Sequence, residues 1–471
     1  MKRFCVLLLL LVVAVTTTFA ATKIKVACIG NSITFGHGIK DRDVNSYPAQ
    51  LQQILGEEYE VKNFGVSSRT TLFKGNFPYV ETTQYKESLA FEPDIVIIKL
   101  GTNDSKEMNM KYVDEYEDDY QKIIDSYAAL SSTPRIILVT PLKCYHKSSD
   151  RFGISDRILR ESITPKIFNV AYKNGLEVIN GQPLCGYELD LSILPDKLHP
   201  SAQGATMMAE HFAEVILADR DSEFDIFKGL DDGEEFSFYG YKGMEYKTEG
   251  LEFKVVQPKV ANSQRSWVIR ARFWGHEPQV DQRLLEMGFH IAYCDVANLF
   301  GSAEAVKRWD RLYDILRYEG LSKKVVLEGM SRGGLIVYNW AVENRKKVSA
   351  IYADAPVMDL KSWPMGDTKY TKECNSMKEA YGMSEEQMLL YEGNPVDHAK
   401  RIAKSKIKIM HVIGDADDVV PYSDNTARFA ESLRGYGGEI EIIIKEGIGH
   451  HPHSLKDPKS IADFILRAEG L

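Results

Sequence analysis

The fold of the N-terminal half is decided by residues 24–36, which read IKVACIGNSITFG. Residues 24–29 form an apolar run that predicts a buried parallel strand, and Gly30, Asn31 and Ser32 follow it directly. Open αβ sheets bind ligands at the carboxyl ends of their strands. Ser32 therefore stands where a catalytic nucleophile would meet its substrate.

Ser32 needs partners, because a serine hydroxyl is a weak nucleophile until a base accepts its proton. Residues 196–200 read DKLHP and supply both a base, His199, and a carboxylate to orient it, Asp196. Two groups at later strand ends are suited to stabilise an oxyanion. They are the backbone N–H of Gly65 and the side-chain amide of Asn103.

Four sequence blocks carry a family resemblance over residues 23 to about 220. Ser32, Gly65, Asn103 and His199 stand in the order and context typical of SGNH hydrolases, also called the GDSL esterase family. The resemblance implies a flavodoxin-like domain with Ser-His-Asp esterase chemistry, commonly the deacetylation of carbohydrates. It also implies that the Ser32 N–H is a third oxyanion donor.

One residue departs from the family pattern. Asn31 occupies the position of the Asp in the family name, which removes a charge beside the nucleophile but no proposed catalytic group. The alternative to catalysis is that Ser32 is a turn residue and His199 a residue that begins a helix.

Strand-like runs alternate with amphipathic segments throughout the N-terminal half, which predicts one doubly wound parallel sheet. These runs lie at residues 24–29, 61–66, 94–100, 135–140 and 176–180. We place the domain boundary near residue 222, which gives domains at residues 23–222 and 223–471.

The C-terminal half begins with a different pattern. Residues 235–257 are rich in Phe, Tyr and Val with glycine turns, which predicts an antiparallel hairpin or meander. A second αβ alternation follows, so the whole chain is predicted to be of the α/β class. Its strand-like runs lie at residues 267–273, 290–295, 324–328, 349–353, 408–413 and 439–444.

A second candidate nucleophile, Ser331, lies in residues 329–334, which read GMSRGG. A predicted strand precedes this segment and a helical segment follows it, which is the setting that a G-x-S-x-G nucleophile elbow requires. Asp417 and His450 follow in the chain order of an α/β-hydrolase triad, each after a predicted strand.

Residues 250–471 resemble α/β hydrolases on these motifs. The resemblance implies Ser331 as nucleophile, Asp417 as the orienting carboxylate and His450 as base. The spacing between the nucleophile and the aspartate leaves room for a cap-like insertion at about residues 363–397.

The oxyanion donors of this second site would be the Arg332 N–H and an N–H of the loop at residues 273–278, for which we take Trp274. Asp354 and Asp359 follow another predicted strand and could approach the same site, although capping or turn roles explain them equally well.

Several assignments at the second site stay open. Asp415 and Asp418 flank the chosen aspartate, and His451 and His453 follow the chosen histidine. A metal site built from the three histidines is an alternative, but no carboxylate or cysteine pattern completes it, so we expect no metal. Another alternative is a C-terminal domain that binds without catalysing.

Residues 1–20 have the order of a secretory signal peptide. Lys2 and Arg3 precede an apolar run of ten residues at 6–15, and small residues follow it up to Ala20, after which we expect cleavage. A membrane span needs about 20 apolar residues, so we expect an exported protein, periplasmic or secreted, without membrane insertion.

Composition excludes some classes of function. The chain has 58 Lys and Arg against 67 Asp and Glu, a net charge of −9 that provides no attraction to nucleic acid. The five cysteines that would follow cleavage are an odd number without a C-x-x-C pair, which disfavours a zinc site or a disulfide scaffold. Export would permit a disulfide, of which Cys144 with Cys185 is one option.

These patterns together predict an exported serine esterase with two domains. Both domains would use acyl-enzyme chemistry without a cofactor. The family resemblance implies acetylated poly- or oligosaccharides as substrates, with a different ester for the second domain. A lipase or thioesterase is one alternative, and a single-site esterase with a catalytically silent, glycan-binding C-terminal domain is another.

Overall fold

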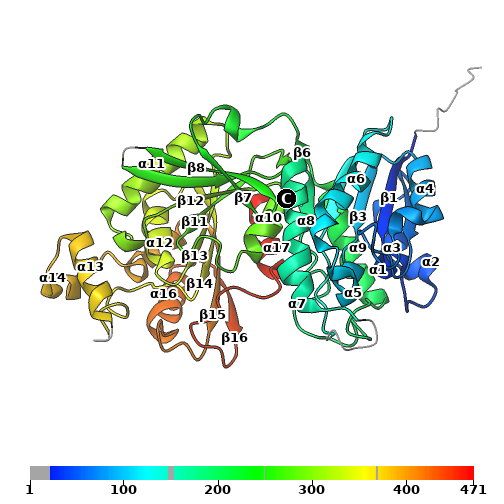
Figure 1. Cartoon of the computed structure of the whole chain (residues 1–471). Coiled ribbons are helices and arrows are strands. Elements are labelled where there is room, and N and C mark those ends of the chain that lie inside the picture. Colours follow the sequence, from blue (N-terminus) through cyan, green and yellow to red (C-terminus); the bar gives the residue numbers. More distant parts are fainter. Residues whose placement is uncertain (1–21, 147–152, 249, 367–369) are drawn as a thin grey trace, which may run out of the picture.

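The computed structural model describes residues 22–146, 153–248, 250–366 and 370–471. The predicted signal peptide at residues 1–20 lies outside the described residues. Two main β-sheets lie side by side, the first built by the N-terminal half, at the right of Figure 1, and the second by the C-terminal half. The predicted α/β class is confirmed.

The first sheet is entirely parallel, with the strand order β2-β1-β3-β4-β5. This is the flavodoxin-like order that the resemblance implied. Its strands are β1 (Ile24–Gly30), β2 (Tyr59–Gly65), β3 (Ile95–Lys99), β4 (Arg135–Val139) and β5 (Glu177–Ile179). Two helix pairs pack together beside it, α3 (Tyr47–Leu55) with α9 (Ala202–Leu217), and α6 (Tyr116–Ala128) with α8 (Thr164–Asn174).

The second sheet has nine strands in the order β16-β15-β14-β13-β11-β12-β9-β8-β7. The predicted meander is confirmed as β7 (Glu234–Phe238), β8 (Tyr241–Thr248) and β9 (Leu251–Val256), all antiparallel. The parallel strands are β11 (Trp267–Ala271), β12 (His290–Cys294), β13 (Val325–Met330), β14 (Val348–Asp354), β15 (Lys408–Gly414) and β16 (Glu441–Lys445). The predicted insertion contains α13 (Thr371–Tyr381) and α14 (Glu385–Leu389).

An apolar cluster continues from one half of the molecule into the other. Helices α10 (Gln279–Glu286) and α17 (Lys459–Glu469) lie between the two sheets in Figure 1 and add Leu284 and Phe464 to the cluster that also buries Val26 and Phe212. The predicted boundary falls next to β6 (Arg220–Asp221), which pairs with β10 (Ala261–Asn262) of the C-terminal half. The division near residue 222 stays a prediction.

Polar contacts accompany this apolar interface. The Glu286 carboxylate accepts hydrogen bonds from the Asn180 backbone N–H at 2.8 Å and lies 2.8 Å from the His211 ring. The Tyr241 hydroxyl donates to the Val178 carbonyl at 2.8 Å. The two halves are therefore joined by specific hydrogen bonds as well as by apolar packing.

The suggested disulfide between Cys144 and Cys185 is wrong for this structure, in which neither residue forms one. The Cys185 thiol is buried and donates instead to the Gly204 carbonyl at 3.7 Å. Burial raises the pKa of this thiol to about 12, which keeps it protonated and unreactive. In the described part of the chain, no helix has the length and apolar character needed to cross a membrane.

Candidate active sites

Ser32, His199 and Asp196 come together at the carboxyl edge of the first sheet. The Ser32 hydroxyl lies 2.9 Å from His199 Nε2, and His199 Nδ1 lies 2.7 Å from Asp196 Oδ2. Ser32 begins the short helix α1 (Ser32–Phe35), and the Asn31 side chain caps that helix by accepting the Ile33 N–H. The three side chains have the geometry of a Ser-His-Asp triad.

The segment that carries Asp196 and His199 is held by its own hydrogen bonds. Asp196 Oδ1 accepts the backbone N–H groups of Leu198 at 3.0 Å and His199 at 2.7 Å. Burial raises the pKa of Asp196, but these donors and the His199 ring outweigh it and hold the pKa below its usual value. Burial lowers the pKa of His199 despite the neighbouring carboxylate, so its ring is neutral and able to accept a proton at pH 7.

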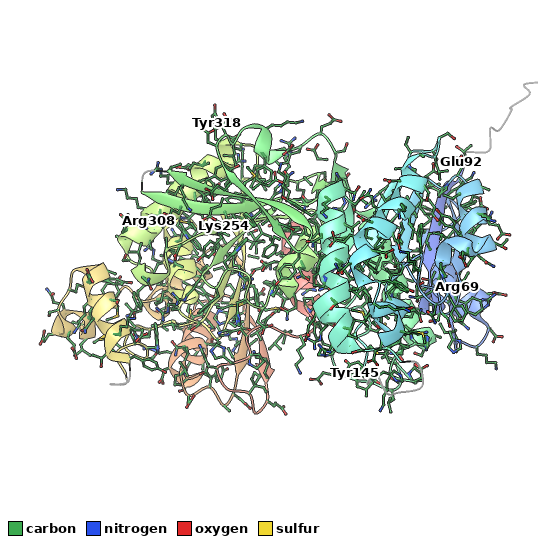
Figure 2. All side chains as sticks on the ribbon, viewed as in Figure 1. Arg69, Glu92, Tyr145, Lys254, Arg308 and Tyr318 are labelled. Atoms are coloured by element: carbon green, nitrogen blue, oxygen red, sulfur yellow. The ribbon has the colours of Figure 1, made fainter. Side chains whose placement is uncertain are left out.

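Figure 2 locates this site in the molecule. Tyr145 lies at the lower end of the N-terminal half, Arg69 lies in its lower half at the right edge, and Glu92 lies near its upper end. The Arg69 carbonyl accepts a hydrogen bond from the Asn103 amide at 3.1 Å, and the Tyr145 N–H donates to the Lys197 carbonyl at 3.0 Å. The site therefore faces the lower end of the molecule in this view.

Ser331, His450 and Asp417 form a second arrangement of the same kind in the C-terminal half. The Ser331 hydroxyl lies 2.9 Å from His450 Nε2, and His450 Nδ1 lies 2.7 Å from Asp417 Oδ2. Of the open assignments, the structure joins these three residues, whereas Asp415 accepts the Gly447 N–H instead. Burial raises the pKa of Asp417, but His450 and backbone donors outweigh this and lower it overall.

The backbone at Ser331 is strained, as a nucleophile elbow requires. Its φ of 52° lies in the left-handed region, which costs a residue with a side chain about 1–3 kcal/mol. Gly333 lies two residues further on, at the start of α12 (Gly333–Glu343), where a Cβ would lie 2.9 Å from the Ala271 carbonyl oxygen. The glycine thus allows α12 to approach β11 closely.

Sequence comparisons match the two halves of the chain to two different families. Residues 28–207 match the GDSL-like lipase/acylhydrolase family, and residues 317–469 match the prolyl oligopeptidase family. The chain joins a GDSL-like acylhydrolase domain to an α/β-hydrolase domain. It is similar to an acetylxylan esterase of Xylanibacter ruminicola, with 42% identity over 210 residues. That match covers 41% of this chain and 43% of the relative, less than half of either protein.

Solved structures give weaker likenesses. A Mycobacterium tuberculosis puromycin-hydrolyzing peptidase is 14% identical, with coverage of 48% of this chain and 38% of that one and a TM-score of 0.39. The Pyrococcus horikoshii acylaminoacyl peptidase is 16% identical, with coverage of 52% and 43% and a TM-score of 0.39.

The two predicted oxyanion donors of the GDSL-like domain are near other acceptors in the structure. The Gly65 N–H donates to Asn63 Oδ1 at 2.9 Å, and one N–H of the Asn103 amide donates to the Arg69 carbonyl. Gly65 also has a steric role, because a Cβ there would lie 2.3 Å from the Phe35 nitrogen of α1. To bind an oxyanion, the Gly65 N–H would have to exchange its hydrogen bond with Asn63 Oδ1 for one with the oxyanion. The Asn103 amide has a second N–H that can donate to the oxyanion.

Two notable residues of the GDSL-like domain were not among the predicted site residues. The His37 ring lies 4.6 Å from the His199 ring, centroid to centroid, and Lys99 at the end of β3 is fully buried. Burial lowers the pKa of Lys99 to about 8, and its ammonium makes no hydrogen bond within the described residues. The sequence showed Lys99 only as a charge at the end of an apolar run.

Arg270 forms hydrogen bonds with the predicted oxyanion loop of the α/β-hydrolase domain. This buried guanidinium donates to Asp281 and to Glu328, the latter at 2.9 Å, and also to the carbonyls of Phe273 and His276. These contacts join the loop to the strand that precedes Ser331. Arg270 was not among the predicted site residues.

The two residues predicted to donate to this oxyanion have side chains that contact aromatic rings. The Trp274 ring lies 4.9 Å from that of Phe238 in the meander and 5.4 Å from that of Tyr293 in β12, centroid to centroid. The Arg332 guanidinium lies over the Trp363 ring at 4.7 Å. Burial and the nearby Arg272 lower the pKa of Arg332 to about 10.

Proposed function

We propose that the chain is an exported serine esterase that removes acyl groups, chiefly acetyl, from carbohydrates. The observation that carries this proposal is the hydrogen-bonded series Ser32, His199 and Asp196 in a GDSL-like domain. Similarity to a protein named acetylxylan esterase supports an acetylated carbohydrate as substrate. Export rests on the signal-like residues 1–20.

The proposed reaction begins when His199 Nε2 accepts the Ser32 proton as the hydroxyl oxygen attacks the ester carbonyl. The tetrahedral intermediate carries its negative charge toward Asn103 and Gly65. His199 then gives the proton to the departing sugar oxygen, which leaves an acyl-serine. Water attacks this ester through the same base and releases the acid, while Asp196 stabilises the imidazolium in both steps.

We propose the same two steps for Ser331, with His450 as base and Asp417 as the orienting carboxylate. The positive φ of Ser331 supports this role. A nucleophile elbow is a strained turn that exposes the serine hydroxyl, and the surrounding fold keeps the backbone in that strained conformation. The second site would then take a different ester of the same polymer.

Serine variants test the proposal. Acetate release from acetylated xylan and from an aryl acetate is measured for wild type, Ser32→Ala, Ser331→Ala and the double variant. Ser237→Ala, which removes an exposed hydroxyl outside both sites, is the matched control. We expect each single variant to lose a different activity and the double variant to lose all of them. Full activity in Ser32→Ala on every ester would overturn the role of the first site.

Further substrates separate the alternatives. A long-chain aryl ester tests the lipase and thioesterase alternatives, and a peptide aryl amide tests the chemistry suggested by the family name of the second domain. Faster cleavage of the long-chain ester than of the acetate would contradict the carbohydrate deacetylase. Unchanged rates in Ser331→Ala on all four substrates would favour a C-terminal domain that only binds.

A further inference from the structure

A second Asp-His pair lies beside the triad of the α/β-hydrolase domain. His453 Nδ1 lies 2.8 Å from Asp354 Oδ1, and the other oxygen of Asp354 accepts the Ser454 N–H at 2.9 Å. Asp354 is fully buried and His453 is 2% exposed. The proposed esterase chemistry uses neither residue.

The pairing with Asp354 determines which nitrogen of His453 carries the hydrogen. A carboxylate only accepts hydrogen bonds, so in the neutral ring the hydrogen is on Nδ1 and a lone pair remains on Nε2. This Nε2 is buried and makes no hydrogen bond within the described part of the chain. Leaving a buried acceptor without a partner costs about 1–3 kcal/mol, which points to a ligand that the lone pair would bind.

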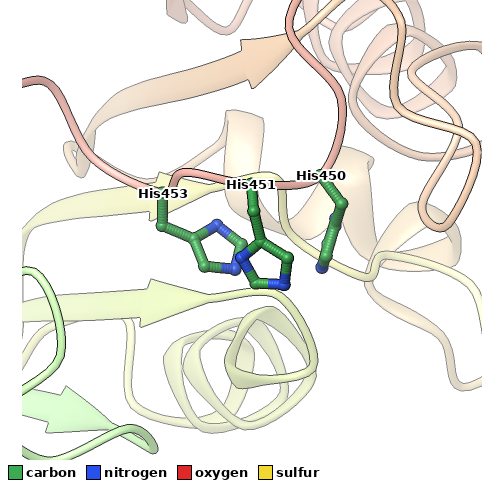
Figure 3. A group of neighbouring side chains, drawn as sticks. All are labelled: His450, His451 and His453. Carbon is green, nitrogen blue, oxygen red and sulfur yellow. The ribbon is translucent and has the colours of Figure 1, made fainter.

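Two more imidazoles lie next to this lone pair (Figure 3). The ring centroids of His450 and His451 lie 4.8 and 4.7 Å from that of His453, and one nitrogen from each of the three rings lies within 4.8 Å of the other two. His450 also has Nδ1 on a carboxylate, and its Nε2 lies 2.9 Å from the Ser331 hydroxyl. His451 is exposed, so its ring can turn.

We propose that His450, His451 and His453 bind a divalent transition metal ion, for which Zn²⁺ is the expected occupant, and that this ion switches the Ser331 site off. Imidazole nitrogens are preferred Zn²⁺ ligands, and ligating histidines usually donate their second N–H to a carboxylate, as Asp354 and Asp417 allow here. Zn–N bonds of about 2.0–2.1 Å in a tetrahedral site need nitrogens about 3.4 Å apart. Rotation of the exposed His451 ring would bring it closer to the other two.

Occupation blocks catalysis because His450 Nε2 has a single lone pair. Once that pair is donated to the metal, His450 cannot accept the Ser331 proton. No carboxylate near this cluster in the sequence indicated a partner for His453, because Asp354 lies 99 residues before it.

Metal uptake is measured first, because it does not require esterase activity. The full chain is titrated with Zn²⁺ alone by calorimetry, and bound zinc is counted after dialysis. We expect one ion per chain in wild type and in His37→Asn, which removes an exposed histidine beside the other triad. His451→Asn should lose the site, and Asp354→Asn should weaken binding by about 10–100-fold while near-UV circular dichroism reports its folding.

Inhibition of ester hydrolysis by Zn²⁺ is measured second. This part of the inference rests on the proposed function of Ser331. Zn²⁺ should abolish the ester hydrolysis that remains in Ser32→Ala and leave that of Ser331→Ala unchanged. No uptake by wild type, or equal uptake by His451→Asn, overturns the metal site. Uptake without loss of Ser331-dependent hydrolysis overturns the switch. If Ser32→Ala hydrolyses nothing, the proposed function of Ser331 fails, while calorimetry still decides the metal site.

Discussion

The buried carboxylate Glu328 should make the stability of the α/β-hydrolase domain depend on pH. Glu328 and Asp281 both contact the guanidinium of Arg270, and all three residues are at most 1% exposed. Burial raises the pKa of Glu328 to about 8, an effect that Arg270 opposes and the nearby Asp281 reinforces. The single positive charge of Arg270 therefore interacts with two carboxyl groups, and one of these two groups keeps its proton at pH 7.

The sign and size of the effect follow from this raised pKa. In the unfolded chain Glu328 ionises near pH 4.5, so between pH 4.5 and about 8 the folded protein holds a proton that the unfolded chain has lost. The free energy of unfolding must therefore fall as pH rises through this window. Within this window the loss is at most about 1.4 kcal/mol for each pH unit.

Glu328→Gln tests this reasoning, because the amide keeps the side-chain volume and cannot ionise. Urea unfolding is followed at pH 5, 7 and 9 by tryptophan fluorescence, which reports on the C-terminal half because all five tryptophans lie there. Wild type should lose much more stability from pH 5 to 9 than Glu328→Gln, and the exposed control Glu304→Gln should follow wild type. Equal slopes for wild type and Glu328→Gln would refute the argument and indicate that Glu328 is ionised in the folded protein.

Three further predictions concern the GDSL-like domain. Gly65→Ala should reduce Ser32-dependent acetate release on the order of 100-fold, since its Cβ would displace α1, and unchanged kcat/KM would contradict the close approach. Lys99→Met should raise the free energy of unfolding at pH 7 by about 3 kcal/mol, because burial lowers the pKa of Lys99 from 10.5 to about 8. Urea unfolding measures this gain in stability, which should shrink as pH rises from 8 to 10.5 and the lysine of the wild type loses its charge. The acid limb of the pH–kcat/KM profile of Ser331→Ala should have its midpoint below pH 6.5, because burial lowers the pKa of His199, and a midpoint above 6.5 would argue against His199 as base.

Local sequence patterns were sufficient for the strands and for the positions of the two serines. The run at residues 135–140 forms β4, and the run at 408–413 forms β15, because short β-branched runs between turn residues favour buried strands. Ser32 and Ser331 each follow such a strand at a glycine-containing turn. Their positions depend on neighbours within a few residues, so the sequence contains the relevant information.

Contacts between distant segments could not be predicted in the same way. Nothing near Asp354 indicates His453 as its partner, and nothing near Arg270 indicates that it would hold the oxyanion loop. The same holds for Lys99, whose burial depends on how β3 is covered by the rest of the domain. Such pairings depend on which chain segments the topology brings together, and a single sequence does not report them.

The apolar cluster shared by the two halves has a consequence for protein engineering. Leu284 and Phe464 of the α/β-hydrolase domain belong to the same buried cluster as residues of the GDSL-like domain, so separating the two domains would expose apolar surface to water. A graft of the GDSL-like domain onto another enzyme would need new polar residues on that surface, or α10 and α17 carried along with it. The two domains should therefore be transferred together to a new protein.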